Sequence, residues 1–162
     1  MNPEGKLKNL PIIHLTLVMG LVMFLGLSWI LNKDKKLILD WNHPLVLVLL
    51  AVSSGGVTAA FLVPMGIVAS SLKKLARNKQ GNAGTLADLL IGAHIARMAM
   101  FEGPALFGLL VFFLHANLAG LYLALILIAL MAALFPFPGK SLEKWQSLEE
   151  RYQLIVQEGQ GV

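Results

Sequence analysis

Long apolar stretches are the feature that most restricts how this 162-residue chain can fold. In the first of them, residues 10–31, only His14 is ionisable. A helix of that length, at about 1.5 Å per residue, crosses a hydrocarbon core of about 30 Å. Only 14% of the residues are charged and 57% are hydrophobic, whereas a soluble domain carries roughly a quarter charged residues. The sequence therefore predicts an integral membrane protein.

Three further apolar stretches follow, at residues 45–70, 86–114 and 118–135. Each is read as a transmembrane helix, since a helix satisfies its own backbone groups in lipid. The four stretches predict an all-α fold, an integral membrane four-helix bundle formed by residues 1–139. The last stretch is almost purely aliphatic, so we expect it to face lipid.

Residues 140–162 form a segment of a different kind. Apolar residues recur in it at helical spacing between charged residues, namely Leu142, Trp145, Leu148, Tyr152 and Ile155. This pattern predicts a C-terminal amphipathic helix in a cytoplasmic tail. Two placements are open: the helix lies on the membrane surface or on a partner, or it packs on the protein's own loops.

Basic residues are distributed unevenly between the two predicted sides of the membrane. Four spans place both termini and the loop 71–85 on one side, and these segments hold Lys6, Lys8, Lys73, Lys74, Arg77, Lys79, Lys140, Lys144 and Arg151. The opposite side holds Lys33, Lys35 and Lys36. The positive-inside rule then predicts a multi-pass membrane protein with both termini cytoplasmic. The net charge of +4 reflects this bias, and we expect no nucleic-acid partner.

The residue types that are missing exclude several chemistries. The chain has no cysteine, which excludes disulfides, zinc–thiolate sites, iron–sulfur clusters and cysteine nucleophiles. The sequence also contains no metal-ligand cluster, phosphate-binding loop or nucleophile–base pair. We therefore expect a protein that is not an enzyme and that holds no metal or cofactor.

Glu102 is the first candidate for a functional residue, because it lies near the middle of the apolar stretch 86–114. A charged carboxyl at that depth costs roughly 2.5–3.5 kcal/mol or more. We therefore expect Glu102 to be protonated unless a cation or an arginine reaches it. If stretches 45–70 and 86–114 pack as a hairpin, Ser54 and Thr58 lie at a similar depth, and their hydroxyls are candidate partners of the carboxyl.

Arg97, His94 and His14 are the further polar candidates inside the predicted spans. Arg97 is five residues before Glu102, about 140° away around a helix, so we expect it to reach headgroups or another helix. His94 is about 80° away from Glu102 and about 12 Å along the axis, and His14 lies at a similar depth. Two interpretations of His14 and His94 are open. In the first, a polar path runs past both histidines to Glu102. In the second, each histidine bonds a backbone carbonyl or faces the interface.

Pro104, two residues after Glu102, leaves the carbonyl of Met100, four residues earlier, without its helical donor. A broken backbone beside an intramembrane carboxyl is typical of ion sites, and it is also how ordinary helices kink. The centre of stretch 45–70, at residues 53–60, is rich in small residues, which allow another helix to approach closely.

Residues 102–109, Glu-Gly-Pro-Ala-Leu-Phe-Gly-Leu, resemble the ion-carrying helix of the rotor-ring proteolipid (subunit c) of rotary ATP synthases. The preceding loop at residues 75–80 is similar to the polar loop of that family. The resemblance implies that Glu102 is a proton- or sodium-binding carboxylate and that Arg77 is the loop arginine. It covers only the middle hairpin, and spans outside it have no counterpart in the usual single-hairpin subunit, so a subunit-c-like four-span protein is expected rather than a rotor subunit. Together with the short loops, the resemblance also implies a bacterial inner (cell) membrane.

Two functions remain open from the sequence. In the first, the protein is a structural or interaction subunit in the lipid bilayer, Glu102 is a protonated packing residue, and the partner is a further copy or another membrane protein. In the second, Glu102 binds or translocates a proton or sodium ion, with Thr58 or Ser54 as a hydrogen-bond partner.

Overall fold

The computed structural model describes residues 3–78 and 80–158, so the predictions made for Lys79 and for residues 159–162 lie outside the described residues. In the described residues the regular structure is helical, apart from an isolated bridge between Ile38 and Asn117. This confirms the predicted all-α class. The helices are α1 (Pro3–Leu7), α2 (Leu10–Asn32), α3 (Pro44–Arg77), α4 (Ala83–His115), α5 (Leu118–Ala133) and α6 (Pro138–Glu158).

Three segments of the described chain are long and apolar enough to cross a membrane: Glu4–Asn32, which includes α2, and the helices α3 and α4. The fourth predicted span is shorter than expected, because α5 has 16 residues and a length of about 24 Å. Helix α5 is long enough to count as a candidate span only together with α6, and the two helices are bent by 71° relative to each other. The chain therefore has three candidate spans, or four if this bent pair counts as one.

The ends of the helices follow local signals in the sequence. Helix α3 begins at Pro44, where a missing N–H costs no helical bond. Asn82 and Thr85 form a capping box at the start of α4, each side chain bonding the other's backbone N–H at 2.9 and 2.8 Å. Ala116 adopts a left-handed conformation (φ 51°) after α4, and Asn117 caps α5 by accepting from the Ala119 N–H at 3.0 Å. These caps produce the tight turn between α4 and α5.

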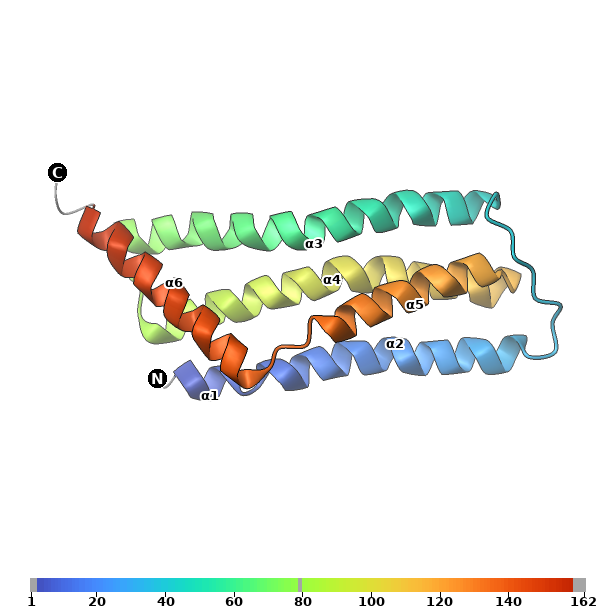
Figure 1. The fold of residues 1–162 in the computed structure, drawn as a ribbon, viewed down its shortest axis with the longest axis horizontal. Helices are drawn as coiled ribbons and strands as arrows, with labels where there is room; N and C mark the ends of the chain where they lie inside the picture. Colours follow the sequence, from blue (N-terminus) through green and yellow to red (C-terminus); the bar gives the residue numbers. More distant parts are fainter. Residues whose placement is uncertain (1–2, 79, 159–162) are drawn as a thin grey trace.

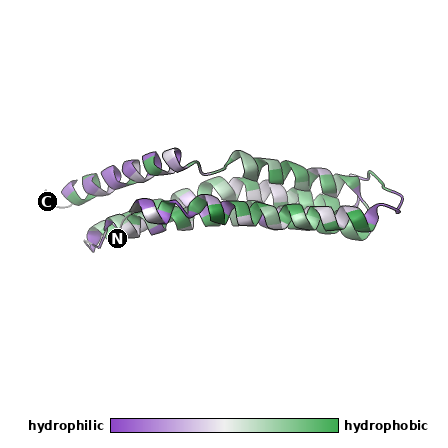
Figure 2. Ribbon diagram, turned by 90° about the horizontal axis from the view of Figure 1, so that it is seen from below, coloured by the Kyte–Doolittle hydropathy of each residue, from purple (hydrophilic) through white to green (hydrophobic). Residues whose placement is uncertain are grey.

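Helix α4 is the centre of the arrangement, because it contacts each of the other helices. Helices α2 and α3 lie on either side of it, and α5 and α6 lie across one face of this three-helix layer, α5 over one half and α6 over the other (Figures 1 and 2). In the described chain no helix covers the opposite face of α4. We call this surface the open face of α4.

One side of α5 packs against α4 rather than facing outward. Gly108 and Gly120 mark the closest approach, since a Cβ on either glycine would lie 2.8 Å from the backbone carbonyl oxygen of the other. The expectation that the fourth apolar stretch faces lipid is therefore wrong for this side. The buried residues of α5 are Ala119, Gly120, Leu121, Ala124, Leu127 and Met131. The outward side of α5 exposes Tyr122, Leu125, Ile126 and Leu130.

Helices α3 and α4 have 34 and 33 residues and lengths of about 50 Å, so they extend well beyond the end of α5. Helix α6 covers this extension (Figure 1). Its apolar side, the extension and Leu7 of α1 form one buried cluster, which comprises Leu7, Leu72, Ala76, Leu86, Ala87, Trp145, Leu148 and Tyr152. The amphipathic helix therefore packs on the protein itself, as in the second placement, but on its helices rather than on its loops.

Candidate functional site

Glu102 lies at the edge of the open face of α4. Its side chain is half-buried, whereas Ala99, Gly103 and Leu106, its neighbours on the helix surface, are exposed. In the described part of the chain its carboxyl has no hydrogen-bond or ion-pair partner. The open face is otherwise apolar, and its exposed α4 residues are Gly92, Ile95, Ala99, Gly103, Leu106, Leu110 and Leu114.

Ser54 and Thr58 are not brought to Glu102. The Ser54 hydroxyl donates to the carbonyl of Ala51 and the Thr58 hydroxyl to that of Ser54, both at 2.9 Å, and both side chains are exposed. Such bonds to the preceding turn are common for hydroxyls within helices. The expected hydrogen bond to the carboxyl is therefore absent.

The reason is the direction in which α3 presents its small residues. Gly56 is the residue that meets α4: a Cβ there would lie 2.8 Å from the Met100 carbonyl oxygen and 2.9 Å from Cγ of Pro104. Ser54 and Thr58 are each two residues from Gly56, about 200° around the helix, so they point away from α4. The close approach predicted for the small residues of α3 is confirmed at Gly56.

Arg97 reaches another helix, one of the two alternatives expected for it. Its Nε donates to the carbonyl oxygen of Ala60 in α3 at 3.1 Å, and its guanidinium lies 5.8 Å from the centre of the Phe61 ring. The Ala60 carbonyl is free to accept because Pro64, four residues later, has no N–H. Ala60 was not expected as the partner of Arg97, although a proline four residues after that carbonyl was a usable signal.

His14 and His94 are brought together across the contact between α2 and α4. His14 Nδ1 lies 3.1 Å from His94 Nε2, a hydrogen-bond distance in which one ring nitrogen donates and the other accepts. His14 is buried, and the ring of Phe135 contacts it edge-on at 5.3 Å between centroids. No hydrogen bond in the described chain joins this pair to Glu102. The polar path from the histidines to the carboxyl therefore stays a prediction.

A second polar contact between α2 and α4 lies at the end of both helices that is far from His14 and His94. The amide of Asn32 in α2 donates to the carbonyls of Phe112 and Phe113 at the end of α4, at 3.2 and 3.3 Å. The rings of His43 and His115 also lie together there, tilted by 48° with 4.7 Å between centroids. Neither contact was expected from the sequence, because each joins residues more than 70 positions apart.

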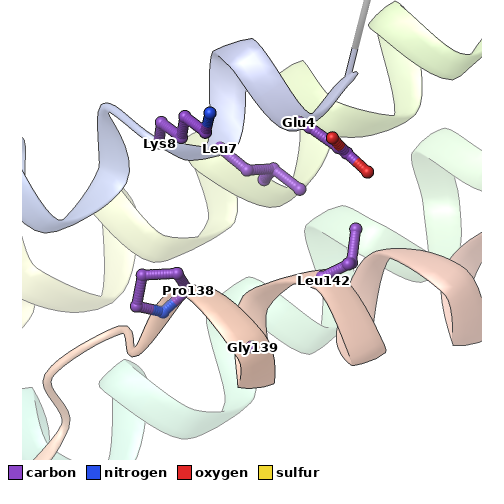
Figure 3. A pocket seen from close by; sticks show the side chains of 6 residues that line it. All are labelled: Glu4, Leu7, Lys8, Pro138, Gly139 and Leu142. Atoms are coloured by element: carbon purple, nitrogen blue, oxygen red, sulfur yellow. The ribbon is translucent and has the colours of Figure 1, made fainter.

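The cavity found between α1 and α6 does not include Glu102 or the other candidate residues. A cavity of about 270 Å³ lies between α1 and α6 (Figure 3), lined by Glu4, Leu7, Lys8, Pro138, Gly139 and Leu142. Arg77, the predicted loop arginine, is exposed at the end of α3. No group of three or more histidine, aspartate or glutamate side chains in the described residues is arranged to hold a metal ion.

No protein-family model matches this chain, and neither the curated proteins nor the solved structures searched contain a match. The resemblance of residues 102–109 and of the loop at residues 75–80 to subunit c therefore stays a prediction that rests on the sequence alone.

Proposed function

We propose that this protein is an integral membrane protein without enzymatic activity that acts as an interaction subunit through the open face of α4. The observation that carries the proposal is the half-buried Glu102 carboxyl, which has no partner in the described chain and lies beside an apolar, uncovered surface. A carboxyl inside hydrocarbon is costly, and a partner that hydrogen-bonds it offsets part of that cost.

The proposed placement in the membrane follows from helix lengths. We place the outer boundary of the hydrocarbon core where α4 ends at His115, beside the polar Asn32. A core of about 30 Å then reaches the level of His14 and Phe135. Glu102, about 20 Å from the end of α4, lies within this core. The termini, the turn between α3 and α4, and α6 lie beyond the inner boundary, on the cytoplasmic side.

The alternative, proton or sodium binding by Glu102, is supported by the resemblance to subunit c. The hydroxyls of Ser54 and Thr58 bond their own helix, so under this alternative another subunit supplies the ligands. The ion-binding alternative predicts that a hydrophobic carbodiimide labels Glu102 near neutral pH, since carbodiimides attack protonated carboxyls. Sodium or high pH should then suppress the labelling.

Two substitutions of Glu102 separate these functions. Glu102→Gln keeps the size of the side chain and its hydrogen bonding but cannot ionise. Glu102→Leu removes both the hydrogen bonding and the ionisable group. We expect complexes extracted in mild detergent to keep their mass with Glu102→Gln and to dissociate with Glu102→Leu, as measured by native mass spectrometry. Retained complexes in both variants, together with an ion flux in proteoliposomes that Glu102→Gln abolishes, would replace the interaction function with ion binding. Release of the wild type from membranes by alkaline carbonate would contradict membrane insertion itself.

A further inference from the structure

We propose that the open face of α4 binds a second copy of this chain, with the two Glu102 carboxyls hydrogen-bonded to each other; this rests on the membrane placement proposed above. The site is incomplete in one copy, because the Glu102 carboxyl has no partner in the described residues. Two arguments, depth and the chemistry of the carboxyl, favour a second copy over an unrelated partner, and the shape of the surface allows a helix to approach.

The first reason is depth. Copies of one chain inserted with the same orientation hold each residue at the same distance from the membrane surface. A symmetric contact along α4 about an axis normal to the membrane therefore places Glu102 level with Glu102 of the second copy. An unrelated partner would need its own polar residue at this depth, where such residues are rare.

The second reason is the chemistry of the carboxyl. A neutral carboxyl has both an O–H donor and a carbonyl acceptor, so two of them are complementary to each other. Arg97 is the only lysine or arginine between Lys79 and Lys140. It lies on the α3 side of α4, where Ala60 accepts its hydrogen bond. The open face therefore offers a second copy a carboxyl and no competing cation.

The shape of the surface beside Glu102 allows another helix to come close. Ala99 and Gly103 are exposed one turn apart, and a Cβ built on Gly103 meets no atom within 4 Å. Small side chains at this spacing let two helices approach closely enough for short polar side chains to meet. Helices α5 and α6 lie on the other side of α4 (Figure 2), so they do not obstruct this approach.

Cysteine cross-linking tests the proposal directly, because the chain has no cysteine of its own. Gly103→Cys and Ala99→Cys each place one thiol on the open face, and Ile126→Cys places one on the exposed side of α5. In oxidised membranes we expect disulfide-linked dimers from Gly103→Cys or Ala99→Cys and none from Ile126→Cys. Equal cross-linking at all three positions would indicate random collision and overturn the proposal.

The role of the carboxyl is tested by self-association of purified, labelled protein in liposomes, measured by energy transfer as the lipid ratio increases. Glu102→Leu should weaken the dimer roughly three- to tenfold, and Glu102→Gln should retain it. If the wild type stays monomeric in liposomes while a complex that depends on Glu102 persists in native membranes, the partner is another protein. The second-copy inference then fails and the proposed interaction function stands.

Discussion

Two prolines determine how α3 and α4 contact each other at the level of single residues. Each leaves one backbone carbonyl without its helical donor. The carbonyl left free by Pro64 accepts a hydrogen bond from Arg97. The carbonyl left free by Pro104 lies against Gly56, which has no side chain to separate the two backbones. Both contacts are specific enough to test by substitution.

The first prediction concerns the bond between Arg97 and Ala60. Replacing Arg97 by methionine leaves the Ala60 carbonyl without a donor, which we expect to lower the free energy of unfolding by about 1–3 kcal/mol. In a Pro64→Ala background the new N–H of residue 64 satisfies that carbonyl, so Arg97→Met should cost less there. The difference between the two backgrounds is measured by unfolding of the detergent-solubilised protein. An identical cost in both would show that Pro64 does not create the acceptor.

The second prediction compares two adjacent glycines of α3. A Cβ at Gly56 would lie too close to the Met100 carbonyl and Pro104, whereas a Cβ at Gly55 meets nothing within 4 Å. Gly56→Ala should destabilise the protein by about 1–3 kcal/mol through overpacking. Gly55→Ala is the matched control and should leave stability unchanged or slightly higher. Thermal unfolding in detergent measures both, and equal effects of the two changes would contradict the contact.

At the scale of elements, α6 is held by its apolar side and by one contact with the turn between α3 and α4. The Tyr152 hydroxyl accepts a hydrogen bond from the Gly81 N–H at 3.1 Å. A Cβ at Gly81 would overlap the Tyr152 ring. Trp145 lies in the same buried cluster and reports on its integrity.

The third prediction is that Gly81→Val releases α6 from the extension of α3 and α4. In a background with Trp29→Phe and Trp41→Phe, the emission of Trp145 should shift to longer wavelength as its ring becomes hydrated. Trypsin should also cut faster at Lys144 and Arg151. Gly139→Ala is the control, because a Cβ there meets nothing within 4 Å. A buried Trp145 in Gly81→Val would mean that Tyr152 moves aside without loss of docking.

At the scale of the whole molecule, most of the described lysine and arginine residues lie at one end. Helix α1, the turn between α3 and α4, and α6 lie together there (Figure 1), opposite the loop with Lys33, Lys35 and Lys36. Lys6 forms an ion pair with Asp88 at 2.6 Å and joins α1 to α4 at this end. Under the proposed orientation, this end is the cytoplasmic one.

The fourth prediction concerns orientation. Asp34→Cys lies in the loop between α2 and α3, and Gln146→Cys lies on the exposed side of α6. A membrane-impermeant maleimide should label only Asp34→Cys in intact cells and both variants after permeabilisation. Labelling of Gln146→Cys in intact cells would reverse the proposed orientation and leave the helical fold unaffected.

Much of the helical framework was predictable because it depends on local chemistry. A long apolar stretch forms a helix wherever its backbone must satisfy its own hydrogen bonds, and caps such as Asn82 with Thr85 end helices locally. For this reason the predicted span 10–31 differs by one residue from α2, Leu10–Asn32. The predicted start of the fourth span at Leu118 coincides with that of α5.

The sequence by itself determined the helices and, through residue spacing, the position of each polar side chain along its helix. Only the tertiary structure decided which sides of the helices meet, since rotation about an axis is set by packing at contacts such as Gly56 against Pro104 and Gly108 against Gly120. Such contacts turn Ser54 and Thr58 away from Glu102 and leave the carboxyl at the open face. They join residues distant in the chain, so no local pattern specifies them.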